Sequence, residues 1–412
     1  LIGDRNMRKK HVDLEILAKN LDISPTMHKY AVERYEGISN YLESQGIKAE
    51  FYPQGSFRTG TVVRPLKNGI ETDFDIDVVC ELSNCKKDTS PKMVKLSVGD
   101  ALKKDETYRK KLEPEEERCW TLTYAKVTDE IGLKLDVVPC VKEDESIKQI
   151  LKAHNVKSEY AEKAISITEK NESEYKWLAS NPNGYGDWFD DINKRFLNDN
   201  LSQKKKTFFM ENRTIFAESA SAEDVPNYYI KSSLQRIIQL LKRHRDIYYS
   251  QIKDGETLRP ASVIIVTLVA KIAYSAPDTD IESLLSYVVS GLKEYACILQ
   301  GRTPTPRFFG EQRNYIEKKD QKWKICNPVN PDDNYADSWT DETAKAFFRW
   351  VNAVSVDLSD PTPIDETRYL TGLKSGLGSK FIEKSLPDLK VPSVSKGQNT
   401  IHYPTKPWAN FR

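Results

Sequence analysis

The sequence predicts an α/β (α+β) fold in two lobes, and three observations support this prediction. At 412 residues the chain exceeds one typical domain. Short apolar runs bounded by turn residues dominate residues 48–140, which is typical of strands, whereas helical apolar spacing dominates from about residue 200. No segment repeats at a fixed period, which excludes a solenoid. We therefore expect a sheet-containing lobe followed by a helical lobe.

Composition limits the class of protein. Hydrophobic residues make up 39% and charged residues 30% of the chain, with a formal net charge of +1, which fits a soluble globular protein. This charge gives no argument for nucleic-acid or membrane binding. No apolar run approaches the roughly 18 residues of a membrane span. Residues 1–10 lack the apolar core of a signal peptide, although the chain begins at Leu1 and a leader can be missing. The six cysteines show no C-x-x-C spacing, so we expect reduced thiols in a cytoplasm and no zinc site.

Residues 24–45 are predicted to form the first long helix. Ser24 can cap this helix, and Pro25 suits its first turn. Apolar side chains then recur at helical spacing, at Ala31, Tyr35, Ile38 and Leu42.

The pattern that follows is that of strands. The predicted strands are residues 49–52, 73–82, 121–125 and 133–139. A helical turn is expected after residue 54, a loop over 64–69 because of its Pro and Asn-Gly, and a partly charged helix over 91–113.

The second half is predicted to be mainly helical. Leu234, Ile237, Ile238 and Leu241 form an i, i+3, i+4, i+7 apolar stripe. Further helices are expected over 263–270, 281–299 and 341–354, the first of them buried. Two turn signals fall within 180–189, and residues 204–206 are expected to be a solvated lysine face or loop. Residues 372–380 are Gly-rich but lack the spacing of a phosphate loop and are interpreted as a turn.

The stretch from Gln54 to Leu82 carries the candidate chemistry. Gly55 and Ser56 form a small, flexible pair that can bring backbone N–H groups close to a phosphate. Asp75 and Asp77 project from the same face of the predicted strand because side chains alternate along a strand. Asp136, in another apolar run, could join them from a neighbouring strand. Such carboxylates are suited to holding divalent metal on a nucleoside triphosphate.

Simpler interpretations stay open for each of these features. The Asp-rich segment could be an amphipathic strand with one wet face, and the Gly-Ser pair could be a plain tight turn. Asp73 also forms an Asp-x-Asp with Asp75 and shares its strand face. The Val78-Val79 run favours the pair Asp75 and Asp77, which leaves Asp73 as an edge residue.

These motifs, in this order, resemble the nucleotidyltransferase superfamily and, more narrowly, the bacterial CD-NTases, the cyclic-oligonucleotide synthases related to cyclic GMP–AMP synthase. The resemblance runs from about Ser24 to Trp339. It rests on Q-G-S-F-R-T-G-T (54–61), D-F-D-I-D-V-V-C-E-L (73–82), L-D-V-V-P (135–139), S-N-P-N-G-Y-G-D-W-F (180–189), L-Q-R-I-I-Q-L-L-K-R-H-R-D (234–246), S-V-I-I-V-T-L-V-A (262–270) and N-P-V-N-P-D-D-N (327–334).

The resemblance implies a polymerase-beta-like architecture. It predicts a mixed-sheet catalytic lobe over residues 1–200, a helical lobe over 201–385 that closes the active-site cleft, and a long N-terminal spine helix linking the two. Residues 386–412, rich in Pro, Ser, Lys and Asn, are expected to be an extended tail.

The resemblance also implies roles for single residues. Asp75 and Asp77 would bind the metal on the triphosphate side, and Asp136 would complete a second metal site and accept the proton of the attacking hydroxyl. Gly55 and Ser56 would contact the phosphates. The nucleotide-binding set is Gln54, Gly55, Ser56, Lys242 and Ser262. Arg243 and Arg245 are alternatives to Lys242, Gln54 and Arg58 are as easily surface residues, and Tyr185 can either stack on a base or pack in the core.

The expected activity is synthesis of a cyclic di- or trinucleotide second messenger from ATP and/or GTP, with Mg²⁺ or Mn²⁺, two ions per site, in bacterial antiphage signalling. A linear oligoadenylate synthase, an RNA or protein nucleotidyltransferase and a catalytically silent nucleotide sensor are the alternatives. We expect no double-stranded DNA requirement, no membrane association and a monomer, with ancillary regulatory proteins as possible partners.

Overall fold

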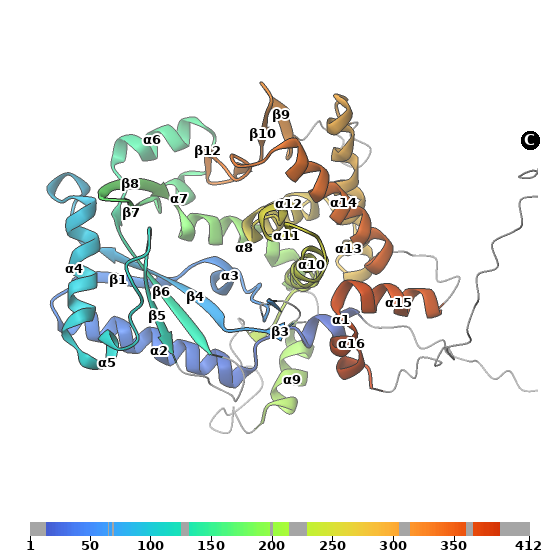
Figure 1. Cartoon of the computed structure of the whole chain (residues 1–412), viewed down its shortest axis with the longest axis horizontal. Helices are drawn as coiled ribbons and strands as arrows, with labels where there is room; N and C mark the ends of the chain where they lie inside the picture. Colours follow the sequence, from blue (N-terminus) through green and yellow to red (C-terminus); the bar gives the residue numbers. More distant parts are fainter. Residues whose placement is uncertain are drawn as a thin grey trace, which may run out of the picture.

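The structure is a computed structural model that describes residues 14–64, 66–67, 70–124, 132–197, 201–213, 229–304, 314–359 and 366–387. These residues form a lobe built on a mixed sheet and a lobe of helices (Figure 1), so the predicted two-lobed α/β fold is confirmed. The expected tail, 386–412, lies almost wholly outside the described residues. No helix in the described ranges combines the length and apolar character needed to cross a membrane.

The six-stranded sheet of the first lobe is mixed in direction. Its main strands, in spatial order, are β1 (Ala49–Pro53), β4 (Phe74–Leu82), β6 (Leu133–Lys142), β7 (Ile165–Asn171) and β8 (Glu174–Ser180). β4 and β6 are parallel, whereas every other pairing in this sheet is antiparallel. β5 (Trp120–Tyr124) pairs with the first half of β6, opposite β4. The predicted strands are therefore confirmed, whereas β7 and β8 were not predicted.

Two helices build the apolar core of the sheet lobe. α2 (Pro25–Ser44) begins as predicted, with the Ser24 hydroxyl accepting the Met27 N–H at 3.1 Å. Its buried side chains pack with those of α4 (Pro91–Lys104) and with the apolar face of β4 and β6. The predicted helix over 91–113 breaks at Asp105, because this residue caps a separate short helix, α5 (Glu106–Arg109).

The helical lobe is organised around α10 (Ser233–Ser250), whose predicted apolar stripe is fully buried. Its core also contains α1, the second half of α8, and the apolar faces of the later helices. The bounds are α1 (Leu14–Lys19), α8 (Pro182–Leu197), α12 (Ser262–Ala273), α13 (Ile281–Glu294), α14 (Asp341–Leu358), α15 (Glu366–Leu377) and α16 (Ser379–Ser385). Consequently the N-terminal segment joins both lobes: α1 packs in the helical core, and α2 packs in the sheet core.

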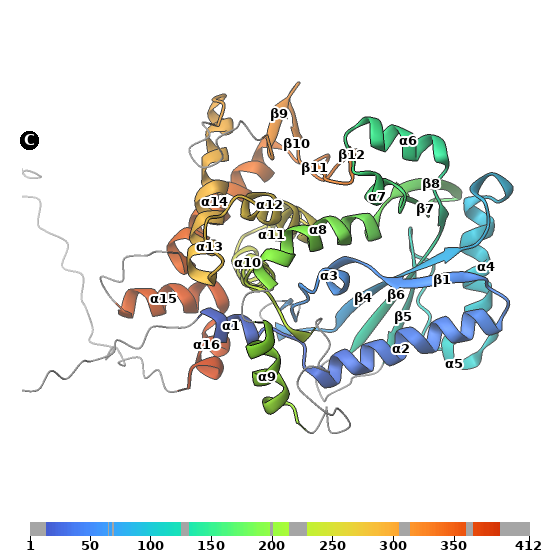
Figure 2. The same ribbon diagram turned by 180° about the vertical axis from the view of Figure 1, so that it is seen from behind.

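Smaller elements complete the described chain. They are α3 (Gly55–Arg58), β2 (Leu66–Lys67), β3 (Ile70–Glu71), α6 (Glu145–Ala153), α7 (Ser158–Ala161), α9 (Leu201–Glu211), α11 (Gly255–Leu258), β9 (Glu317–Lys319), β10 (Lys322–Lys324), β11 (Cys326–Asn327) and β12 (Asn330–Asn334), with 3-10 turns at Lys86–Asp88 and Tyr295–Gln300. α3 lies between the sheet and α10 in both views (Figures 1 and 2). The segment expected as a loop pairs partly as β2 and β3, and the lysine triplet lies on helix α9.

Two predicted turns are instead helical. Most of the 180–189 segment is the start of α8, because Asn181 accepts the Gly184 N–H at 3.0 Å and Pro182 fits the first turn. Residues 372–380 end α15 and begin α16, with a break only at Gly378, whose φ is +97°. In both segments glycines that suggested turns serve close packing, as at Gly376 against His244.

Candidate functional site

A cavity of about 550 Å³ separates the two lobes and brings most of the predicted site residues together. Its wall combines the turn at residues 54–56 (the phosphate turn, after its expected role), the part of β4 that carries Asp75 and Asp77, the start of α8, the polar face of α10 and the start of α12. The predicted residues in the wall are Gln54, Gly55, Ser56, Asp75, Asp77, Lys242 and Ser262. Asp136 does not line the cavity but lies on β6, beside Asp77 and on the same face of the sheet.

The acidic residues lie on neighbouring parallel strands. The β4–β6 register pairs Asp77 with Asp136 and Asp75 with Lys134. On β4, buried Phe74, Ile76 and Val78 alternate with the two aspartates, which point toward the cavity. The predicted alternation is thus confirmed.

Asp73 lies just outside this arrangement. It precedes β4, and its Oδ1 accepts the Gly132 N–H at 2.7 Å where β6 begins. This bond ties the two strand starts together, so Asp73 is an edge residue with a local structural partner, as expected.

Repulsion and desolvation act on the acidic cluster. Burial, followed by the charges of Asp136 and Asp75, raises the pKa of Asp77 to about 6. The pKa of Asp75 is also raised. The first cause is desolvation, because the cavity walls limit the contact of this side chain with water although it reaches the surface, and the second is repulsion by Asp136. Asp136 accepts the Thr121 hydroxyl at 2.5 Å. No ion pair joins Asp75, Asp77 or Asp136 to a cation within the described ranges.

The phosphate turn lies against β4. The Gln54 N–H donates to the Asp77 carbonyl at 2.9 Å, and Gly55 follows at φ +62° to start α3. A Cβ on Gly55 would lie 2.8 Å from Asp77 Oδ2, so only glycine allows the turn to lie this close to the carboxylate. The phosphate turn and the Asp77 carboxylate are therefore direct neighbours.

A row of polar side chains on α10 holds the segment that follows the phosphate turn. Gln235 donates to the Thr59 carbonyl at 2.9 Å, and Gln239 donates to the Val62 carbonyl at 2.8 Å. Lys242 Nζ donates to the carbonyl and the hydroxyl of Thr61, both at 3.0 Å. This row lies on a different face of α10 from the apolar stripe, so one helix both fills the core and holds the site.

Lys242 is a buried cation in the cavity wall. Its exposed fraction is only 3%. Burial, with added repulsion from Arg245, lowers the pKa of Lys242 to about 7. A lysine with this pKa gains charge readily when an anion arrives.

The alternative cations differ in where they point. Arg245 also lines the cavity, pairs with Asp246 at 2.7 Å and donates to the Ser262 hydroxyl at 2.9 Å. Arg243 points away and donates to the Leu377 carbonyl, so it is not a cavity residue. Ser262 is therefore in the site, held by Arg245.

The chemistry of the acidic cluster fits divalent metal. Mg²⁺ prefers carboxylate oxygens, and the Asp75, Asp77 and Asp136 carboxylates repel one another without a paired cation. Within the described ranges, no group of three or more His, Cys, Asp or Glu side chains is already placed to hold a metal ion. The fit therefore rests on the shared strand face and the uncompensated charge, and side-chain rotation would complete a ligand set.

Comparisons with known proteins agree with this geometry. A family model described as "Second Messenger Oligonucleotide or Dinucleotide Synthetase domain" matches residues 9–193. The c-di-GMP synthase of Roseivirga ehrenbergii is 30% identical over 352 residues, which cover 84% of this chain and 77% of the relative. The chain belongs to the CD-NTase family. It is therefore a nucleotidyltransferase from a family of cyclic dinucleotide synthases.

More distant CD-NTases share the fold. The cyclic dinucleotide synthase CdnG of Bradyrhizobium diazoefficiens is 29% identical over 245 residues, which cover 57% of this chain and 52% of the relative. The structure of the CD-NTase CdnG in complex with GTP superimposes with a TM-score of 0.62 at 21% identity, covering 91% of this chain and 97% of that one. CdnC of Escherichia coli MS115-1 with ATP gives a TM-score of 0.54 at 16% identity, covering 90% and 99%.

Several cavity residues of this CD-NTase were missed from the sequence. Arg259 and Asp246 add a second charged pair beside Arg245, and Asp333 and Tyr335 approach from the β11–β12 segment. On α10, polar residues recur at i, i+4, i+7 and i+11. This spacing could have indicated that Asp246 shares a face with Gln235, Gln239 and Lys242. Nothing local in the sequence marks Arg259, whereas Asp333 belongs to the 327–334 motif, for which we predicted no contact. Tyr185 lines the cavity and its hydroxyl lies 2.9 Å from that of Thr267, so it packs in the wall.

Proposed function

We propose that this CD-NTase joins two molecules of GTP into cyclic di-GMP, with release of two pyrophosphates. The observation that carries the nucleotidyl-transfer part is the pairing of Asp77 with Asp136 beside the phosphate turn in one cavity. The choice of guanine is supported by the name of the Roseivirga relative and by the GTP complex of CdnG.

The proposed reaction uses divalent metal, Mg²⁺ or Mn²⁺, at two ions per site held by Asp75, Asp77 and Asp136. Bound there, the ions would lower the pKa of the attacking hydroxyl and neutralise the leaving pyrophosphate. Gly55 and Ser56 would bind the triphosphate through backbone N–H groups and the Ser56 hydroxyl. Gln54 would hold the turn in place through its N–H bond to the Asp77 carbonyl.

The other residues bind and orient the substrate. Lys242 and Arg245 would bind phosphate oxygens from the helical lobe, with Ser262 keeping the Arg245 guanidinium in position. Asp136 would accept the proton of the acceptor hydroxyl while Thr121 donates to its Oδ1. The cavity would exclude most water from the reacting groups.

The test is product analysis. Purified protein is incubated with Mg²⁺ and with GTP alone, ATP alone, or all four NTPs, followed by phosphatase treatment and mass spectrometry. We expect a phosphatase-resistant product of two GMP units from GTP alone, absent from an Asp75→Asn/Asp77→Asn variant. A cyclic product that requires ATP would replace the guanine assignment, and a three-nucleotide ring would correct the ring size. A linear product would remove the cyclase proposal and favour an oligonucleotide synthase, whereas tight NTP binding without turnover would favour a silent sensor.

The cellular role follows as a second proposal. We propose that the product is a second messenger in antiphage defence in a bacterial cytoplasm and that basal activity needs no double-stranded DNA. In the native host, Asp75→Asn/Asp77→Asn is expected to increase phage plaque counts. Unchanged counts would overturn the defence role, and a DNA requirement in the product assay would overturn the second point. A monomer, with ancillary regulatory proteins as possible partners, remains our prediction, and light scattering tests the oligomeric state.

A further inference from the structure

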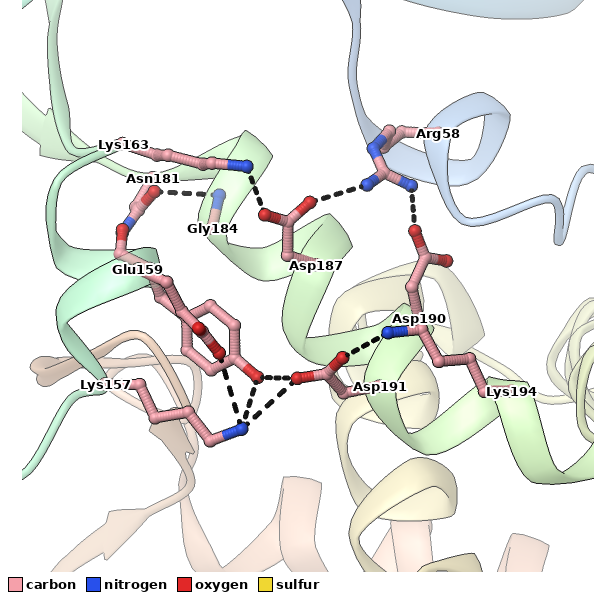
Figure 3. A network of polar contacts seen from close by, with 11 residues as sticks. Arg58, Lys157, Glu159, Lys163, Asn181, Gly184, Asp187, Asp190, Asp191 and Lys194 are labelled. Atoms are coloured by element: carbon pink, nitrogen blue, oxygen red, sulfur yellow. Dashed lines mark hydrogen bonds and ion pairs between the residues drawn. The ribbon is translucent and has the colours of Figure 1, made fainter.

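We propose that Arg58 is a positioning residue for nucleotidyl transfer, which holds the phosphate turn at a fixed distance from α8. The inference rests on the proposed function, because the turn matters only if it binds a triphosphate. Arg58 is the last residue of α3, the short helix that begins at Gly55. Its side chain extends away from the turn toward α8, whose second half packs in the helical core (Figure 3).

Arg58 joins α3 to α8 through two ion pairs. One guanidinium nitrogen, Nη2, donates to Asp187 Oδ1 at 3.0 Å, and the other, Nη1, donates to Asp190 Oδ2 at 2.8 Å. The two aspartates lie three residues apart on one face of α8. Arg58 is only 23% exposed and its partners are 31% and 43% exposed, so the pair is partly shielded from solvent.

The backbone of α8 is shaped to receive the guanidinium. A Cβ on Gly186 would lie 2.6 Å from Arg58 Cζ, so the planar group lies directly against glycine. A planar fork with several fixed donors can reach two carboxylates in different directions, whereas a lysine ammonium is a single point charge. This site therefore distinguishes arginine from lysine.

Arg58 supplies an attachment that the other contacts of the turn lack. β4 holds the turn at its start, through the Gln54 N–H, and α10 holds the segment after it, through the carbonyls of Thr59, Thr61 and Val62. Within the described residues, Arg58 is the only residue of α3 that forms a hydrogen bond or ion pair with α8. Because α8 begins in the cavity wall with Pro182 and Tyr185, this tie sets the spacing between the phosphate turn and that wall.

A direct phosphate contact is the competing role for Arg58, which also lines the cavity. Both of its terminal nitrogens already donate to carboxylates, Asp187 and Asp190, and these two bonds hold the guanidinium against α8, which favours positioning. The two roles predict different results for the aspartates. If Arg58 acts through them, removing the aspartates should mimic removing the arginine. If Arg58 binds phosphate, removing the aspartates should leave its function largely intact.

The experiment is a mutant cycle on full-length protein with steady-state kinetics and binding of a non-hydrolysable GTP analogue. The variants are Arg58→Gln, Arg58→Lys, Asp187→Asn/Asp190→Asn and the triple variant. The matched control is Asp191→Asn, a neighbouring carboxylate on α8 that binds Lys157, Tyr160 and Lys194 but nothing on α3 (Figure 3). Melting temperatures separate loss of folding from loss of position.

We expect Arg58→Gln and the double aspartate variant each to lower kcat/KM roughly ten- to hundredfold, since small displacements of bound groups are costly. The triple variant should be no worse than the double aspartate variant, because Arg58 has lost both partners on α8 once the aspartates are replaced, although Asp187 also pairs with Lys163. Arg58→Lys should not restore activity, and Asp191→Asn should match the wild type. Three outcomes would overturn the inference. They are a loss of kcat/KM confined to the Arg58 variants, losses that add up in the triple variant, and an equal loss in Asp191→Asn. An inactive wild type would instead contradict the proposed function.

Discussion

Asp77 and Asp136 lie opposite each other in the parallel pairing of β4 and β6. Two carboxylates on neighbouring strands repel each other, and here the repulsion adds to desolvation in raising the pKa of Asp77. Such a pair destabilises the empty site unless a proton or a cation neutralises it. The arrangement thus lowers the stability of the empty protein and favours binding of a positive charge at this site.

Neutralising this pair should separate activity from stability. Asp77→Asn is expected to lower product formation by more than about a thousandfold, because the proposed metal ligand is lost, while its melting temperature equals or exceeds that of the wild type. Product is measured by mass spectrometry and unfolding by calorimetry. Asp73→Asn is the matched control: its amide oxygen can still accept the Gly132 N–H, so most activity should remain. If Asp73→Asn instead lost more activity than Asp77→Asn, the metal-binding pair would be reassigned to Asp73 and Asp75.

The stability of the apo protein should depend on pH through Asp77. Below pH 3.8 this group is protonated in both the folded and the unfolded chain. Between pH 3.8 and about 6 the folded chain binds more protons, so the contribution of Asp77 to stability falls as pH rises and then stays constant. At about 1.36 kcal/mol per pKa unit, the change is at most about 3 kcal/mol.

The measurement compares wild type with Asp77→Asn by urea unfolding at pH 4 and pH 7.5 without metal. The stability of the variant relative to wild type should be greater at the higher pH. Added Mg²⁺ at pH 7.5 should raise the melting temperature of the wild type and leave the variant nearly unchanged. A pH-independent difference between the two proteins would contradict the role of Asp77.

Lys242 should take up a proton when a triphosphate binds at pH 8. Its pKa of about 7 leaves it largely neutral there, and the incoming negative charge stabilises the ammonium form. Binding should therefore weaken as pH rises above 7. Calorimetric titration of GTP analogue in buffers of different ionisation enthalpy measures the uptake directly.

Lys242→Met should abolish this uptake and lower kcat/KM about ten- to hundredfold, the cost of a lost charge-assisted hydrogen bond of about 1.5–3 kcal/mol. Lys271→Met is the control. Lys271 is another helical-lobe lysine with a lowered pKa, but it donates to the Cys326 carbonyl and does not line the cavity. Equal effects of the two substitutions would indicate a general packing defect.

Gly55 and Gly46 offer a test of close approach at the phosphate turn. Both have positive φ, +62° and +86°, so alanine at either position should cost about 1–2 kcal/mol in backbone strain. Only at Gly55 does the new Cβ meet an atom, Asp77 Oδ2 at 2.8 Å, whereas the space at Gly46 is open. We expect both variants to lose similar stability by urea unfolding, but only Gly55→Ala to lose more than about tenfold in kcat/KM. Full activity in Gly55→Ala would show that the turn can shift freely.

Much of the site was predictable because its signals are local. Strand alternation placed Asp75 and Asp77 on one face, and small residues marked the phosphate turn. Ser24 and Pro25 marked the start of α2, and the apolar stripe identified the buried face of α10. Where local signals had two meanings, prediction was wrong: the glycines of 184–186 and 372–378 suggested turns, but they allow helices to pack closely against Arg58 and Asp357.

The sequence by itself determined which residues could form strands, helices and a candidate metal-binding face, because these depend on periodicity and on neighbours a few positions away. Only the tertiary structure decided which charged groups meet. It placed Asp136 beside Asp77. It turned Lys242 and Arg245 into the cavity but Arg243 away from it. It also joined Arg58 to Asp187 and Asp190, which lie 129 and 132 residues further along the chain. These pairings depend on strand order and on how the two lobes pack, and neither is encoded in any local pattern.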